Sequence, residues 1–145
     1  MTELKLRIGC DIGGVVKNLA DDEPVPDAVG TLGQLLLDGH TVVFVSKCGD
    51  NYRERITEWL GTVGLDRIPV HFCRDYADKV GIATRERLDV MIDDKLQVLS
   101  SFPTTIKKVW FCNDVKKIAG TRRYQPDLLG SVVVCGTWAE VMASL

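Results

Sequence analysis

Short, continuous runs of apolar residues recur along the chain and alternate with segments that carry apolar residues at helical spacing. Such runs, rich in β-branched residues, are typical of strands that are buried on both faces. The predicted strands are residues 6–10, 41–45, 69–73, 88–92, 108–112 and 132–135. The predicted helices are residues 28–37, 76–87, 97–102 and 137–145, together with a helix that Asp50 or Asn51 caps and that ends near residue 63.

This alternation of strands and helices predicts an α/β fold. Strands separated by helices are joined by right-handed crossovers, which produce a parallel sheet with helices on both faces. We therefore expect a three-layer, doubly wound and mostly parallel sheet. No repeat, linker or low-complexity tract interrupts the chain, so residues 1–145 are predicted to form a single domain.

Two segments depart from the alternation. Residues 17–27 are polar and acidic and contain two prolines, which indicates a loop. Residues 113–131 are the least regular stretch, and we predict a long basic loop there. Its basic residues are Lys116, Lys117, Arg122 and Arg123. We interpret them as a solvated face, with contact to a phosphorylated macromolecule as the alternative.

The composition is that of an ordinary globular domain, with 46% apolar and 26% charged residues. A net charge of −2 gives no general attraction to nucleic acid or anionic lipid, although a local basic patch is still allowed. The five cysteines are odd in number and lack CxxC spacing, which indicates reduced thiols. No run reaches the roughly 20 apolar residues that span a bilayer, and residues 1–7 lack a signal-peptide pattern. A cytoplasmic location is therefore expected.

Polar side chains come directly after three of the predicted strands. Asp11 follows the first strand, Ser46 the second, and Asp93 and Asp94 the fourth. In a doubly wound sheet the ligand binds beyond the carboxyl ends of the strands, so we expect these residues to lie close together. Clustered carboxylates raise each other's pKa, and a hard divalent cation such as Mg²⁺ removes that conflict. The pattern predicts a magnesium and phosphate site.

Several groups near these strand ends can bind a phosphate. The hydroxyl of Ser46 and the backbone amides of Gly13, Gly14 and residues 47–49 are potential donors. A cation would complete such a site. Lys79 is the best placed, because it begins the helix before the fourth strand, and Lys47 is its rival.

These residues, in this order, resemble the motifs of the haloacid dehalogenase superfamily, most of whose members are magnesium-dependent phosphatases. The matching segments are Ile8 to Val15 around Asp11, Val42 to Ser46, Asp78 and Lys79, and Val90 to Asp94. The resemblance spans about residues 4–112 and implies a Rossmannoid core without a large cap domain. It implies a phosphohydrolase that acts on a phosphate ester through an aspartyl-phosphate.

The resemblance also implies roles for individual residues. Asp11 would be the nucleophile, and Ser46 and Lys79 would hold the transferred phosphoryl group. The magnesium ligands would be Asp11, Asp93 and the carbonyl of Gly13, with Asp94 acting through a water molecule.

One position departs from the superfamily pattern. The second Asp of the first motif, which protonates the leaving alcohol and activates water, is Gly13 here. General acid–base catalysis contributes about 10²–10⁴-fold, so its loss predicts slow turnover. The alternative is an inactive module that binds a phosphorylated small molecule or macromolecule without cleaving it. Without a cap the site should be open, which suits a large partner or an oligomer that covers it.

Simpler interpretations compete at each position. Asp11 could cap a turn, Ser46 could be a turn residue, and Asp93 and Asp94 could cap the following helix. Lys79 could be an exposed helix lysine. Residues 11–14 also resemble the phosphate loop of the actin-related sugar kinases. That loop leads into a second antiparallel strand in a chain of two such domains, whereas a polar loop follows here in a much shorter chain.

Overall fold

The computed structural model describes residues 4–145, and these residues form one six-stranded sheet. The strands are β1 (Arg7–Cys10), β2 (Thr41–Lys47), β3 (Val70–Cys73), β4 (Val90–Asp93), β5 (Lys107–Phe111) and β6 (Val133–Cys135). Their order across the sheet is β3-β2-β1-β4-β5-β6, and every neighbouring pair is parallel. The predicted doubly wound architecture is confirmed, and the sheet is entirely rather than mostly parallel.

The helices are α1 (Ala28–Leu37), α2 (Asp50–Thr62), α3 (Asp78–Arg85), α4 (Leu96–Ser100), α5 (Val115–Tyr124), α6 (Pro126–Gly130) and α7 (Trp138–Ser144). Every predicted strand and helix is present, and the ends differ from the prediction by at most two residues. Ser46 belongs to β2 rather than following it. None of the helices in residues 4–145 is long and apolar enough to cross a membrane.

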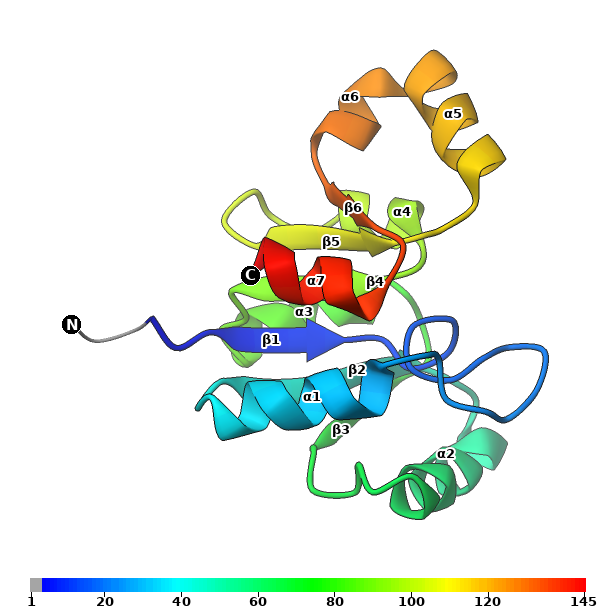
Figure 1. Cartoon of the computed structure of the whole chain (residues 1–145), viewed down its shortest axis with the longest axis vertical. Coiled ribbons are helices and arrows are strands. Elements are labelled where there is room, and N and C mark those ends of the chain that lie inside the picture. The colour runs from blue at the N-terminus through cyan, green and yellow to red at the C-terminus, as the bar shows by residue number, and fades with distance from the viewer. Residues whose placement is uncertain (1–3) are drawn as a thin grey trace.

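Two separate cores cover the two faces of the sheet, because alternate strand residues point to opposite sides. Phe44 packs with α1 and α7 in the first core, whereas Val45 and Met91 pack with α3 and α4 in the second. Figure 1 shows the resulting layers, with α1 and α7 in front of the sheet and α3 and α4 behind it. The five cysteines carry free thiols, as predicted.

Local signals at the helix ends explain two of the boundaries. Gly39 adopts a left-handed conformation with φ of 92°, and its amide donates to the carbonyl of Leu36 at the end of α1. The hydroxyl of Thr137 accepts a hydrogen bond from the amide of Glu140 and so caps α7. The predicted cap of α2 is wrong, because Gly49 occupies that position and Asp50 is the first helical residue.

The prediction of a long basic loop over residues 113–131 is also wrong, since α5 and α6 occupy most of it. Asp114 caps α5 by accepting a hydrogen bond from the amide of Lys117, and Pro126 begins α6. No side chain of α5 is buried, and Ile118 is the α5 residue that packs against the second core. Because so little of α5 packs against the core, its sequence has almost no apolar periodicity. The pattern of apolar residues therefore did not predict this helix.

Candidate functional site

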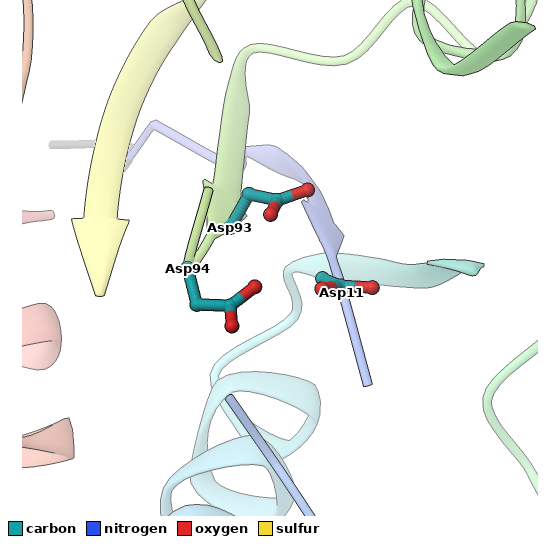
Figure 2. Close-up of side chains that lie close together, drawn as sticks. All are labelled: Asp11, Asp93 and Asp94. Carbon is teal, nitrogen blue, oxygen red and sulfur yellow. The ribbon is translucent and has the colours of Figure 1, made fainter. Parts of the chain in front are cut away.

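Three carboxylates meet at the carboxyl ends of β1 and β4, which are neighbours in the sheet. Cys10 pairs with Ile92, so the residues that follow, Asp11 and Asp93, emerge side by side. One carboxylate oxygen from each of Asp11, Asp93 and Asp94 lies within 4.8 Å of the other two. Figure 2 shows the three side chains converging from the two strand ends. The chain topology thus brings together acidic residues that are far apart in the sequence.

Lys79 reaches this acidic cluster from α3. Its ammonium group lies 3.2 Å from Oδ1 of Asp11 and 2.8 Å from Oδ2 of Asp93. Ile82 and Ala83 hold α3 against the second core, and Lys79 shares their face of the helix because it lies three and four residues before them. The side chain is only 1% exposed, so the interpretation of Lys79 as an exposed lysine is wrong.

The second oxygen of Asp93 and the backbone of Asp94 are held by further contacts. Oδ1 of Asp93 accepts a hydrogen bond from the amide of Lys95 at 3.0 Å, and the carbonyl of Asp94 accepts one from the indole of Trp110 at 3.0 Å. Oδ1 of Asp94, in contrast, is buried without a hydrogen-bond partner within residues 4–145. A buried carboxylate oxygen without a donor is costly, and a bound cation would satisfy it.

Glycine at position 14 lets the loop after β1 approach this carboxylate. Gly14 has φ of +80°, and a Cβ atom there would lie 2.3 Å from Oδ2 of Asp94. Its amide, a predicted phosphate donor, donates to the carbonyl of Lys17 within this turn. Within residues 4–145 the main-chain groups of Gly13 make no hydrogen bond in this turn, where the carbonyl of Ile12 accepts from three amides. The Gly13 carbonyl therefore stays available to a cation.

The cluster is short of positive charge. Three carboxylates face the buried ammonium group of Lys79 and the exposed one of Lys95, which lies 3.8 Å from Oδ2 of Asp94, so carboxylates outnumber cations. Burial and then the charge of Asp93 raise the pKa of Asp11 to about 8, and burial likewise raises the pKa of Asp93. Burial opposes the charge on Lys79, but the two carboxylates together raise its pKa. A divalent cation would balance the charge, and the oxygen donors present are those that Mg²⁺ prefers.

Two other predicted residues lie at the same edge without touching the carboxylates. Ser46 is buried at the end of β2, two residues beyond Phe44, which pairs with Cys10. Its hydroxyl makes no hydrogen bond to the acidic cluster among residues 4–145. Lys47 is exposed, and its ammonium group lies 4.5 Å from the ring centre of Tyr76. Of the two rival lysines, Lys79 is therefore the one in contact with the carboxylates.

A cavity of about 450 Å³ adjoins the cluster and was not predicted. It is lined by Gly14 and Asp94, by Asn18 and Leu19, and by Lys117 at the start of α5. The sequence signal for this cavity is the polar residues after the fifth predicted strand, where the apolar pattern predicts a loop instead of α5.

The comparisons with known proteins agree with the fold and go no further. No family model matches the chain, and no curated protein matches it. It is similar to a de novo designed Rossmann 3x3 fold protein solved by NMR in solution, with a TM-score of 0.52 and 13% sequence identity. The alignment covers 97% of this chain and 94% of the designed one. The chain therefore has a Rossmann-like α/β fold with a parallel sheet.

Proposed function

We propose that this protein is a magnesium-dependent phosphohydrolase that forms an aspartyl-phosphate, in the manner of the haloacid dehalogenase superfamily. The observation that carries the proposal is the contact of buried Lys79 with both Asp11 and Asp93, beside the unsatisfied oxygen of Asp94. A structural ion pair needs one carboxylate for one lysine. A site with more carboxylates than cations is instead suited to a divalent cation and a phosphate.

Each residue has a definite task in this proposal. Asp93, Asp94 and the carbonyl of Gly13 would hold Mg²⁺ together with Asp11, and the ion would supply positive charge to the phosphate oxygens. Lys79 orients Asp11 through Oδ1, which leaves Oδ2 to attack phosphorus. Lys79 also neutralises charge on the phosphoryl group, and Ser46 at the end of β2 donates a hydrogen bond to it.

The reaction then runs in two displacement steps. The Asp11 carboxylate forms a bond to phosphorus as the bond to the leaving alcohol oxygen breaks. Water next attacks the phosphorus of the aspartyl-phosphate, which releases inorganic phosphate and restores the carboxylate. Gly13 has no group that could give a proton to the leaving alcohol, so esters of acidic alcohols such as aryl phosphates should react fastest.

Gly13 also motivates a second candidate function, a module that binds phosphate esters without cleaving them. A carboxylate at this position could be accommodated, because a Cβ atom on Gly13 would meet only Cδ2 of the exposed Leu19, at 3.3 Å. The absence of an acid at position 13 is therefore not forced by a lack of space.

Turnover of an aryl phosphate by the purified chain, with and without Mg²⁺, tests the first candidate. We expect activity that EDTA removes, that Asp11→Asn abolishes, and that the exposed-loop control Asp66→Asn leaves unchanged. Asp11→Asn protein that is as active as the parent would refute the mechanism.

A Gly13→Asp variant separates the two candidates. If the parent is silent toward a broad panel of esters and Gly13→Asp creates strong activity, the binding module is the better description. If the parent already turns over alkyl phosphates briskly, the binding module is refuted.

A further inference from the structure

Helix α5 differs from every other helix in residues 4–145 by its charge. Its ten residues, Val115–Tyr124, include four cationic side chains and no acidic one, and none of them is buried. These side chains are Lys116, Lys117, Arg122 and Arg123. Asp114 precedes the helix, but its carboxylate is engaged in capping. Together with α6, α5 projects beyond β6 at one end of the sheet (Figure 1).

The attachment of α5 keeps its basic side chains in solvent. Ile118 packs against the second core, so the opposite side of the helix faces outward. At the far end, the guanidinium group of Arg123 lies 5.3 Å from the ring centre of Tyr124, whose side chain is 75% exposed. An exposed aromatic ring with an arginine over one face can stack a base on its other face, next to positive charge.

The basic helix begins at the cavity that adjoins the acidic cluster at Asp94. Lys117 lines the same cavity as Gly14 and Asp94, whereas Tyr124 lies at the other end of the helix. Ten helical residues extend about 15 Å. A ligand with its phosphate at Asp11 could therefore continue through the cavity and along α5 only if it were longer than an ordinary metabolite.

We propose that α5 binds single-stranded nucleic acid and presents its terminal phosphate to Asp11, an inference that rests on the proposed function. The phosphates of a strand complement a helix that carries four exposed cations and no acidic residue of its own, and a base can stack on Tyr124. A phosphorylated peptide offers one phosphate and no comparable row of charges, so it uses little of this surface. The net charge of −2 of the whole chain confines the attraction to this helix.

The test measures binding of a fluorescent single-stranded oligonucleotide of about eight nucleotides, a length within the usual range of such sites. The protein is the Asp11→Asn variant with Mg²⁺, so that the terminal phosphate is not removed. Lys117→Ala and Arg123→Ala should each weaken binding several-fold. Each should also reduce the slope of the logarithm of the binding constant against the logarithm of the salt concentration by about 0.7. Tyr124→Ala should lower the affinity for the oligonucleotide at least about fivefold. The matched control is Arg67→Ala, an exposed arginine before β3 at the opposite edge of the sheet.

Several outcomes would overturn the inference. It fails if the α5 variants bind as the Arg67→Ala control does, if removing the terminal phosphate changes nothing, or if a phosphopeptide binds as tightly with the same dependence on α5. If aryl phosphate turnover needs Asp11 but no oligonucleotide binds, the inference fails and the proposed function stands. If binding depends on α5 but turnover does not need Asp11, the basic surface stands and the proposed function fails.

Discussion

Magnesium binding to this protein should weaken steeply between pH 8 and pH 6, because the ion needs Asp11 as a carboxylate. The pKa of Asp11 is raised to about 8 by burial and by Asp93. The carboxylate is then half populated at pH 8 and populated to about 1% at pH 6. The apparent dissociation constant of Mg²⁺ should therefore rise about fifty-fold over this interval, or about 2.3 kcal/mol.

The metal-free protein should show the opposite dependence on pH at this residue. The folded state holds the Asp11 proton up to about pH 8, whereas the unfolded chain loses it near 3.8. The contribution of Asp11 to the free energy of unfolding is thus fully present below about pH 3.8 and is lost as the pH rises to about 8. Magnesium restores stability where the carboxylate is charged, so the increase in Tm that it causes should be larger at pH 8.

Calorimetric titration at pH 6, 7 and 8, with thermal melts at the same pH values, measures both effects. At magnesium well above both dissociation constants, the increase in Tm should differ by about 5–9 °C between pH 8 and pH 6. Asp11→Asn should weaken the binding of Mg²⁺ and remove its dependence on pH. The exposed control, Asp66→Asn, should change neither property. A dissociation constant that stays within twofold from pH 6 to pH 8, or equal binding by Asp11→Asn, would refute the reasoning.

Two further substitutions follow from the contacts of the cluster. Lys79→Met removes the partner of two buried carboxylates and should destabilise the metal-free protein by about 3–5 kcal/mol, seen as a lower midpoint in urea denaturation. Magnesium should recover part of the loss, and full stability without the ion would contradict the charge argument. Gly14→Ala should lower the free energy of unfolding by about 1–3 kcal/mol and weaken Mg²⁺ binding. The reason is that its Cβ would strike the carboxylate of Asp94 and that φ at this position is +80°. Gly13→Ala is the matched control, since it would meet only flexible Leu19, and an equal cost in both variants would contradict the steric reasoning.

Much of the fold and part of the candidate site can be predicted from the sequence for local reasons. An apolar run reports burial of both faces of a strand, and residues 41–45 and 88–92 did so without any tertiary information. The polar residue after each run then falls at the carboxyl edge, as Asp11 and Asp93 do. The boundary of α1 at Gly39 was predictable for the same reason, because a helix cap is made within a few residues.

The tertiary structure decided what depends on contacts between distant segments. The burial of Lys79 follows from how α3 lies on the second core, and an eight-residue helix with few apolar side chains does not reveal it. The pairing of β1 with β4, the close approach of Gly14 to Asp94 and the cavity reached by Lys117 likewise arise only when all the crossovers are in place. The spacing of apolar residues along the chain indicates which side of a helix or strand is buried. Which other segments bury it is determined only by the complete tertiary structure.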